Sequence, residues 1–231
     1  MAGPGFRAGP PLKPVLTGLL GGSFNPAHGA HRRISLFVRD ALALDEVWWL
    51  VSPGNVLKPA AGMAPLPARY ASARQMARRA PIRVTAIEAE LGTRYTIDTL
   101  RQLKRRYPRR RFVWLMGTDN LAQFHRWRGW RRIAYEMPIA VVARPGYDAK
   151  AMASPAMAWL HRWRRRHSQN LIGAKRSAPA LVILRFDPDA RSATAIRAAD
   201  PEWYRRYERT SQHDMLTHRL IAAAAPKAAM R

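Results

Sequence analysis

The chain has 231 residues, a length that suits one large domain or one domain with an appendage. Apolar residues make up 48% of it and aromatic residues 9%, which is enough to fill a core and argues against wholesale disorder. There are no cysteines, so a disulfide framework, a thiolate zinc site and a cysteine nucleophile are excluded. Lys and Arg number 40 against 15 Asp and Glu, and the resulting charge of +25 attracts polyanions and phosphorylated substrates.

The N-terminal segment, residues 1–14, is rich in Gly, Pro and Ala and lacks the apolar run of a signal peptide, so we interpret it as a flexible leader. No stretch approaches the roughly 18 apolar residues that span a bilayer. These features predict a cytoplasmic protein with no membrane partner. We expect a single domain over residues 15–225, with a basic insertion at 154–179, and a short tail at 226–231.

Short apolar runs alternate along the chain with segments of helical periodicity. The expected strands are Pro14–Leu20, Val47–Val51, Ile82–Ile87, Phe112–Met116, Ile139–Ala143 and Leu181–Phe186. The expected helices are His28–Leu44, Pro67–Arg79, Thr96–Tyr107 with Thr96 as N-cap, Ala193–Ala199 and His213–Ala224. Between them, Asn55–Leu66 is expected to be a loop, and the insertion a helical excursion.

Strands made of continuous apolar residues, alternating with helices, are typical of a parallel sheet that is buried on both faces. Right-handed crossovers then give an α/β fold with a doubly wound, mainly parallel sheet and helices on both faces. In such a sheet, ligands bind beyond the carboxyl ends of the strands, at the point where the strand order reverses. The segments that follow strands are therefore the candidate binding segments.

A glycine turn followed by two histidines comes directly after the first expected strand, in the segment Gly21–His31 (GGSFNPAHGAH). It is neither a Walker A loop nor a dinucleotide fingerprint, because both glycine patterns are missing. The turn lets the backbone approach a ligand, and a helix N-terminus presents free amides that suit phosphate. His28 and His31 share a helix face and could donate to oxygens that gain charge in a transition state. From spacing alone, a capping or core role for each histidine stays open.

A second candidate segment, Ser192–Arg197 (SATAIR), follows the last expected strand. It places the hydroxyls of Ser192 and Thr194 and the guanidinium of Arg197 at the start of a short helix. Such hydroxyls cap a helix or bind anions, and arginine pairs with phosphate through two parallel hydrogen bonds. Simple N-capping is the alternative interpretation.

Together, these two segments resemble the signatures of the nucleotidyltransferase superfamily, in which a glycine turn precedes His-x-Gly-His and a Ser-x-Thr-x-Ile-Arg stretch lies near the C-terminus. The resemblance covers roughly Thr17–Ala199 and implies a Rossmann-like nucleotidyltransferase fold. It departs from the pattern at Ala30, where the family usually has glycine and where a methyl group could crowd a phosphate. It also departs at Arg191, which replaces an apolar residue.

The middle of the chain supplies a third segment, Met116–Leu121 (MGTDNL), which runs into Phe124, Trp127 and Trp130. The spacing of three predicts that these aromatic side chains share one helix face. One ring could stack on an aromatic heterocycle, where a cationic pyridinium would gain extra attraction, and a core stripe is the alternative. The segment resembles a stretch of the nicotinate-nucleotide adenylyltransferase family, as do Tyr95–Leu100 (YTIDTL), Val142–Gly146 (VARPG) and Ser52–Lys58 (SPGNVLK).

The resemblance implies roles for particular residues. Trp127 would stack on a nicotinate ring, backbone amides near Thr96 and Arg128 would hold its carboxylate, Asp119 would position a ribose and Lys58 would reach a phosphate. The implied catalytic residues are His28, His31 and Arg197. The implied ATP-binding residues are Gly21, Gly22, Ser23, Phe24, His28, His31, Gly117, Asp119, Ser192, Thr194 and Arg197. The implied substrate-binding residues are Asn25, Lys58, Tyr95, Thr96, Trp127, Arg128 and Arg144.

The implied reaction is transfer of the adenylyl group of ATP to nicotinate mononucleotide, a step of NAD biosynthesis that gives deamido-NAD and pyrophosphate. No side chain looks like a covalent nucleophile, and the acceptor phosphate is already ionised at neutral pH. Positioning and charge stabilisation are therefore the tasks left to the protein. The expected partners are ATP and nicotinate mononucleotide. The expected cofactor is Mg²⁺, bound with ATP and bridging phosphate oxygens with few protein ligands, and no metal site built by the protein is expected.

Two alternatives stay open. The first keeps the chemistry and changes the acceptor, for example to pantetheine phosphate, although the Trp127 region argues against it. The second is a basic RNA-associated protein, because arginine runs at 105–111 and 162–166, with Trp159 and Trp163 close by, are compatible with single-stranded nucleic acid. A solvated basic face is the simpler explanation, and no nucleic-acid motif is present, so nucleic acid is not the favoured partner. The sequence leaves homo-oligomerisation open.

Overall fold

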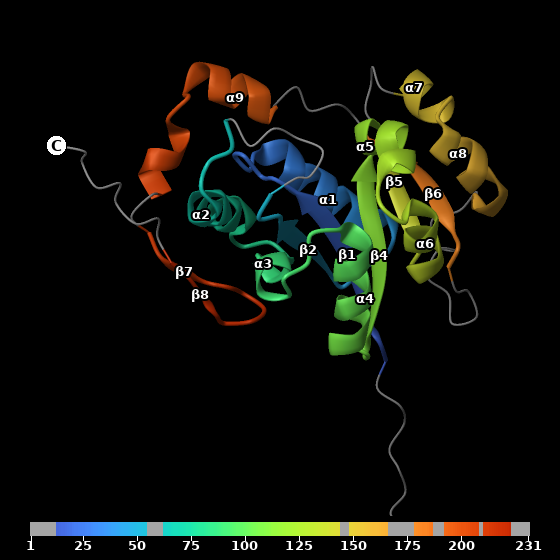
Figure 1. Cartoon of the computed structure of the whole chain (residues 1–231), viewed down its shortest axis with the longest axis horizontal. Coiled ribbons are helices and arrows are strands. Elements are labelled where there is room, and N and C mark those ends of the chain that lie inside the picture. Colours follow the sequence, from blue (N-terminus) through green and yellow to red (C-terminus); the bar gives the residue numbers. More distant parts are fainter. Residues whose placement is uncertain are drawn as a thin grey trace, which may run out of the picture.

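The computed structural model describes residues 13–54, 62–143, 148–165, 178–186, 192–207 and 210–222. Within them, six parallel strands form one sheet in the order β3-β2-β1-β4-β5-β6 (Figure 1). The strands are β1 (Val15–Gly22), β2 (Glu46–Val51), β3 (Ile82–Thr85), β4 (Arg110–Gly117), β5 (Ile139–Ala143) and β6 (Leu181–Arg185). This arrangement confirms the expected doubly wound α/β fold.

The helices of the described residues connect these strands and line both faces of the sheet. They are α1 (Gly29–Ala41), α2 (Leu66–Ala77), α3 (Ile87–Glu90), α4 (Thr96–Arg106), α5 (Thr118–Gln123), α6 (Trp130–Glu136), α7 (Asp148–Met152), α8 (Pro155–Leu160) and α9 (Ala193–Ala199). The described residues also form three short 3₁₀ helices, η1 (Phe124–Arg126), η2 (His161–Trp163) and η4 (Trp203–Tyr207). The expected helical excursion is confirmed over its described part by α8 and η2. None of the helices described has the length and hydropathy that a bilayer crossing requires.

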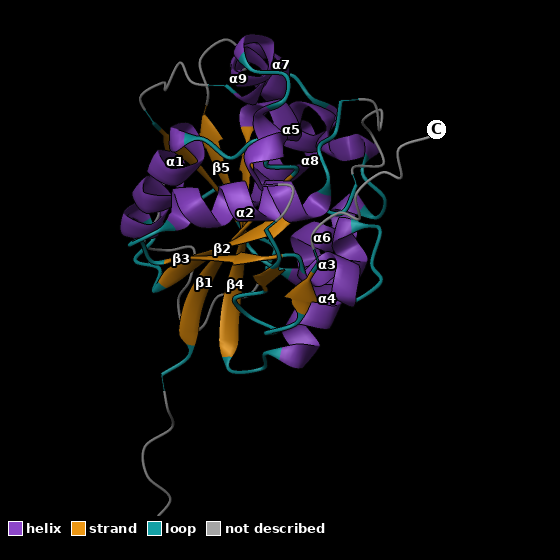
Figure 2. Cartoon of the chain, turned by 90° about the vertical axis from the view of Figure 1, so that its left-hand side faces the viewer, coloured by secondary structure: helices purple, strands orange, loops and turns teal. Residues whose placement is uncertain are grey.

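The sheet is buried on both faces because alternate side chains of each strand pack against different helices. In β2, Trp48 and Leu50 join a core cluster with residues of α4 and α6, whereas Trp49 joins a second cluster with residues of α1 and α2. Both tryptophans are fully buried. The turned view shows α1 and α2 on one side of the sheet and α4 and α6 on the other (Figure 2). Burial on both sides explains why the strands are continuously apolar in the sequence.

The strand order reverses between β1 and β4, which pair in register at the centre of the sheet. Both strands end in glycine, at Gly22 and Gly117. A Cβ on Gly21 would lie 2.6 Å from Cη2 of Trp114, so any larger residue at this position would require the indole to shift. The carboxyl ends of these two strands form the edge at which a doubly wound sheet binds ligands.

The prediction of a helix at His213–Ala224 is wrong over the described residues of that range. They belong to an antiparallel hairpin of β7 (Gln212–His213) and β8 (Leu220–Ile221). Asp214, which is 3% exposed, is the physical reason. Its Oδ1 accepts from the backbone amides of Leu216 and Thr217, which folds the chain into a turn, and its Oδ2 accepts from Thr85 and Ala86 of another segment. Aspartate competes with helix formation through such local bonds.

Two smaller expectations also fail at element ends. The strand expected at Ile82–Ile87 stops at Thr85, because the amides of Ala86 and Ile87 bond to the side chains of Asp214 and Thr85 instead of continuing the ladder. The N-cap of α4 is Tyr95, and Thr96 is the first helical residue.

Candidate active site

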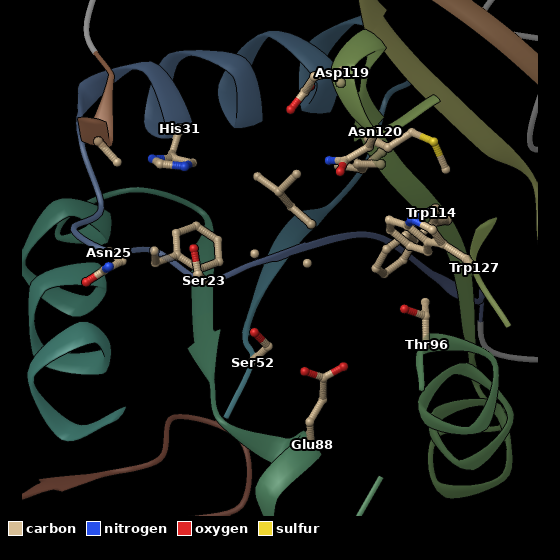
Figure 3. Close-up of a pocket in the computed structure, with 18 of the residues that line it drawn as sticks. Ser23, Asn25, His31, Ser52, Glu88, Thr96, Trp114, Asp119, Asn120 and Trp127 are labelled. Carbon is tan, nitrogen blue, oxygen red and sulfur yellow. The ribbon is translucent and has the colours of Figure 1, made fainter. Parts of the chain in front are cut away.

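A cavity of about 780 Å³ lies at the carboxyl ends of β1 and β4 (Figure 3). Arg197 is absent from the lining of this cavity, but it contacts Asn25 and Thr194, which both belong to the lining. Lys58 and Arg144 lie outside the described residues. The residues predicted from the sequence that line the cavity are Gly21, Gly22, Ser23, Phe24, Asn25, His28, His31, Tyr95, Thr96, Gly117, Asp119, Trp127, Arg128, Ser192 and Thr194.

The two histidines meet at the start of α1. His28 is the N-cap residue, and its ring centroid lies 3.9 Å from that of His31. The backbone amide of His28 donates to Nδ1 of His31 at 3.2 Å. A nitrogen that accepts a hydrogen bond carries no proton, so the neutral imidazole of His31 carries its proton on Nε2. His31 therefore caps the helix with Nδ1, and its ring is part of the cavity wall.

Aromatic packing fixes the orientation of His31. The ring of Phe24 lies 5.0 Å from that of His31 and stacks on Trp49 at 5.0 Å. Phe24 has a φ of 46°, in the left-handed region, and is 2% exposed. This backbone conformation is costly for a bulky residue, and burial of the ring against Trp49 holds it in place. The glycine turn therefore also aims an aromatic side chain beneath the histidine.

Arg69 of α2 ties the segments around this end of the cavity together. It is 1% exposed, and its guanidinium donates to the carbonyl oxygens of Ser23, Ser52 and Ala64 at 2.8, 2.7 and 2.8 Å. Burial lowers the pKa of Arg69 to about 10, so the group stays protonated at neutral pH. Its partners are neutral carbonyls, and its positive charge therefore adds to the field of a site predicted to hold phosphates.

The Ser192–Arg197 segment docks on the same end. Oγ of Ser192 accepts from the amide of Ala195 at 3.1 Å, so Ser192 is the N-cap of α9, as the capping alternative requires. Arg197 donates to the backbone oxygen of Asn25 at 2.6 Å and to Oγ1 of Thr194 at 3.3 Å. These bonds bring two predicted segments, far apart in the sequence, into contact. The binding roles of Ser192, Thr194 and Arg197 stay predictions.

Asn25 uses its side chain to hold a loop. Its Nδ2 donates to the carbonyl oxygen of Gly62 at 2.8 Å, and its Oδ1 accepts from the amide of Ala64 at 3.2 Å. Asn25 is 6% exposed and lines the cavity. The Asn25 side chain therefore positions the loop at Gly62 and Ala64 beside the cavity. Its contact with substrate stays a prediction.

The aromatic wall of the cavity differs from the single helix face that the spacing predicts. Phe124 begins a 3₁₀ turn that ends at Trp127 with an extended backbone, and Trp130 begins α6 after the N-cap residue Gly129, which has a φ of 62°. The three rings still touch, with Phe124 5.4 Å from Trp127 and 5.8 Å from Trp130. Phe124 is fully buried, whereas Trp127 lines the cavity beside Trp114. The core interpretation therefore holds for Phe124, and the stacking role of Trp127 stays a prediction.

Comparison with known proteins agrees with this geometry. The cytidylyltransferase-like family model matches residues 19–199. A protein of Erythrobacter litoralis named "probable nicotinate-nucleotide adenylyltransferase" is 69% identical over 90% of this chain and 94% of its own length. A protein of Bradyrhizobium sp. strain ORS 278 with the same name is 50% identical over 80% of this chain and 97% of its own length. The chain belongs to the nicotinate-nucleotide adenylyltransferase family.

A solved structure shares the family's fold. It is Plasmodium falciparum nicotinic acid mononucleotide adenylyltransferase complexed with NaAD, which matches with a TM-score of 0.59 at 14% identity. The match covers 80% of this chain and 83% of that chain. At this identity the likeness concerns the fold alone.

Ala30, the departure from the family's usual glycine, does not enter the cavity. Its side chain is 2% exposed, and it is absent from the cavity lining. The methyl group is buried at the start of α1 and lies outside the cavity lining.

Several lining residues were not expected from the sequence. The charged ones are Glu88, Arg94 and Arg126, and the aromatic one is Trp114. Figure 3 shows Glu88 pointing into the cavity beside Ser52 and Thr96, on the side away from His31. Burial raises the pKa of Glu88 to about 7, against a hydrogen bond from Thr99 that lowers it. The local sequence around Glu88 carries no motif that distinguishes it from a surface carboxylate.

The donor set around the cavity fits a magnesium ion that arrives on phosphates. Glu88 and Asp119 are the carboxylates of the lining as described, and they lie on opposite sides of the cavity (Figure 3), so Asp119 alone is the candidate to share the ion with phosphates. In the described parts of the chain, no group of three or more His, Asp or Glu side chains is arranged to hold a metal. Mg²⁺ keeps several waters and is commonly held by one or two carboxylates together with substrate phosphates. The cavity therefore has the chemistry for a metal–nucleotide complex.

Proposed function

We propose that the protein transfers the adenylyl group of ATP to nicotinate mononucleotide, forming deamido-NAD and releasing pyrophosphate. The observation that carries this proposal is one cavity with two unlike ends, a histidine end at the start of α1 and an aromatic end at Trp127. The names of relatives that are 69% and 50% identical support the same reaction. A location in the cytoplasm belongs to the proposal, because ATP and pyridine nucleotides are used there.

The histidine end would act on the phosphates. A phosphate oxygen of the acceptor attacks the α-phosphorus of ATP in line, and the bond from that phosphorus to the oxygen bridging to the β-phosphorus breaks. Nε2–H of His31 can donate to an oxygen that gains negative charge as this happens, and Arg197 can pair with the departing pyrophosphate. Asp119 and the phosphates would hold Mg²⁺, which offsets phosphate charge when bound. No general base is required, because the acceptor phosphate is already ionised.

The aromatic end would select the acceptor. The indole of Trp127 offers a face on which a cationic pyridinium gains both stacking and electrostatic attraction. Its edge-on contacts with Trp114 and Phe124 fix the plane of the ring before the ligand arrives. Backbone amides near Thr96 and Arg128 would then hold the carboxylate of the nicotinate. Positioning of this kind is the larger part of catalysis when both reactants are anions.

The test is pyrophosphate release with ATP, Mg²⁺ and one acceptor at a time. The acceptors are nicotinate mononucleotide, its amide counterpart and pantetheine phosphate. Release with nicotinate mononucleotide, and much less with pantetheine phosphate, supports the proposal. Fast release with pantetheine phosphate alone would move the protein to another acceptor, and release with none of the three would contradict the proposed reaction.

A second candidate function, binding of single-stranded RNA, has one observation in its favour. Trp159 and Trp163 lie with ring centroids 4.3 Å apart, and the guanidinium of Arg162 lies 5.8 and 5.1 Å from those centroids. Tyr135 packs edge-on against both and is 58% exposed. Aromatic rings beside arginines suit unpaired bases and their phosphates.

Fluorescence anisotropy of a labelled oligouridylate of about 20 nucleotides separates this function from the effect of net charge. The variant Arg162→Gln with Trp163→Leu changes the aromatic group, and Arg205→Gln in η4 removes an exposed arginine elsewhere. A much weaker complex with the first variant alone would support RNA binding at Trp159 and Trp163. Equal losses would assign any binding to the overall charge of +25.

A further inference from the structure

Glu88 differs from the other half-buried glutamates of this very basic protein. The chain has 40 Lys and Arg against 15 Asp and Glu, so a carboxylate finds a cation easily. Three glutamates do so twice each, with pairs from Glu46 to Arg83 and Arg110, from Glu90 to Arg106 and Arg219, and from Glu136 to Arg101 and Lys104. Within the described residues, Glu88 makes no ion pair. Its carboxyl group faces the cavity instead.

The position of Glu88 is fixed from below. Its Oε1 accepts from Oγ1 of Thr99 at 3.2 Å, and Thr99 lies 2.8 Å from the hydroxyl oxygen of Thr93. The amide of Thr93 donates to the backbone oxygen of Glu88 at 3.1 Å. Glu88, Thr93 and Thr99 are therefore linked in a closed ring of contacts. One carboxyl oxygen is thus anchored. The other has no hydrogen-bond partner within the described residues.

Glu88, Thr96 and Trp127 belong to the end of the cavity that lies away from His31 (Figure 3). Under the proposed function, this end holds the pyridine ring with its carboxylate. A neutral carboxyl group can donate one hydrogen bond to that carboxylate, whereas an ionised one repels it. Toward an amide the preference reverses, because an ionised carboxyl group accepts from the NH₂ group. The protonation state of Glu88 therefore distinguishes the two acceptors.

We propose that Glu88 is a specificity-determining residue, which as a neutral carboxyl group donates to the acid acceptor and as a carboxylate favours the amide. This inference rests on the proposed function and names the residue that controls its acceptor. Burial raises the pKa of Glu88 to about 7, so both forms are populated near neutral pH. Selectivity for the acid then falls as pH rises through this value, since the donating form is lost.

Other charged groups face the same space, and the test has to cancel their effects. Those in the cavity lining are His28, His31, Arg94, Asp119, Arg126 and Arg128. Those packed around α3 and the end of β3 are Glu90, Arg106, Asp214 and Arg219. Groups that act on ATP or on the shared nucleotide part of both acceptors change both rates alike. The ratio of kcat/KM for the acid to kcat/KM for the amide removes them.

The experiment measures this ratio from about pH 6.5 to about pH 8.5 in the wild-type protein, in Glu88→Gln and in the surface control Glu202→Gln. The protonated fraction of an acid falls about tenfold per pH unit above its pKa, so we expect the wild-type ratio to fall by about tenfold or more. In Glu88→Gln the side-chain NH₂ group donates at every pH, so the ratio for this variant should be independent of pH. Glu202→Gln should follow the wild type. A flat wild-type ratio, or an unchanged slope in Glu88→Gln, overturns the inference.

Proton uptake by the wild-type protein gives a second measurement that needs no variant. Calorimetry of acceptor binding in buffers of different ionisation enthalpy should show uptake of up to about half a proton at pH 7 with the acid. Binding of the amide should show no uptake. Equal proton changes for both acceptors overturn the inference. If neither acceptor leads to pyrophosphate release, the proposed function is overturned as well. If pyrophosphate is released but the acid-to-amide ratio of kcat/KM does not depend on pH, only the role of Glu88 is overturned.

Discussion

The two ends of the cavity are built in different ways. The histidine end comes mainly from one continuous segment, Gly21–His31, and backbone contacts hold it, such as the bond from the amide of His28 to Nδ1 of His31. The aromatic end is assembled from separate segments that contribute Glu88, Thr96 and Trp127. A continuous segment leaves a pattern in the sequence, whereas an assembled end exists only once the sheet has formed. The difference separates what is readable in the sequence from what the fold adds.

The ends also differ in the charge that they offer a ligand. The histidine end presents imidazoles and helix amides above the buried charge of Arg69, which suits the phosphates of any nucleotide. The aromatic end presents indole faces and a carboxyl group, which suit a ring and its substituent. Changes at the first end should therefore lower turnover. Changes at the second should alter the choice or the affinity of the acceptor.

The largest effect is expected for His31→Ala. Loss of one preorganised donor to a developing negative charge costs about 10²- to 10³-fold in rate, so kcat should fall by about 100-fold or more. The variant also loses the acceptor of the His28 amide, which should cost about 1 kcal/mol of stability and leave the fold intact. Steady-state kinetics and a thermal melt measure both. His161→Ala, at an exposed histidine in η2, is the control and should behave as wild type. A folded His31→Ala protein with near-normal turnover would contradict the mechanism.

A smaller effect is expected for Gly21→Ala, which lies in the segment of the histidine end but should act on the aromatic end through Trp114. The added Cβ would lie 2.6 Å from Cη2 of Trp114, which is 3% exposed and packs edge-on against Trp127. Overpacking of this kind costs about 1–3 kcal/mol, and displacement of Trp114 should raise the acceptor KM by about tenfold with little change in the KM for ATP. Denaturant unfolding and kinetics with each substrate measure the two effects.

Gly54→Ala is the matched control for stability. A Cβ there meets nothing within 4 Å, so its free energy of unfolding should stay within about 0.5 kcal/mol of wild type. If Gly21→Ala were as stable as this control and kept its acceptor KM, Trp114 would have room to move and the coupling between β1 and the aromatic wall would be refuted.

Much of the fold can be predicted from the sequence because each strand is buried on both faces. The six expected strands lie within two residues of the observed ones. His28 and His31 can be found because they lie three residues apart, directly after a glycine turn. Arg69 and Glu88 cannot, because their burial depends on other segments. Arg69 looks like any helical arginine until the carbonyls of Ser23 and Ser52 surround it, and Asp214 looks helical until Thr85 and Ala86 bond to it.

The smallest effect is expected for Ser192→Ala, which tests how the C-terminal segment supports the histidine end. Loss of the N-cap bond to Ala195 costs about 1 kcal/mol of helix stability. The helix stays attached, because Arg197 still donates to the backbone oxygen of Asn25. The KM for ATP should therefore rise by about fivefold at most, with kcat within about twofold, a range consistent with about 1 kcal/mol. Ser192→Asn restores a capping side chain and should restore the KM if capping is the role of Ser192. If Ser192→Asn recovers its stability but keeps the raised KM for ATP of Ser192→Ala, the hydroxyl itself contacts the phosphates. The histidine end then extends to the start of α9.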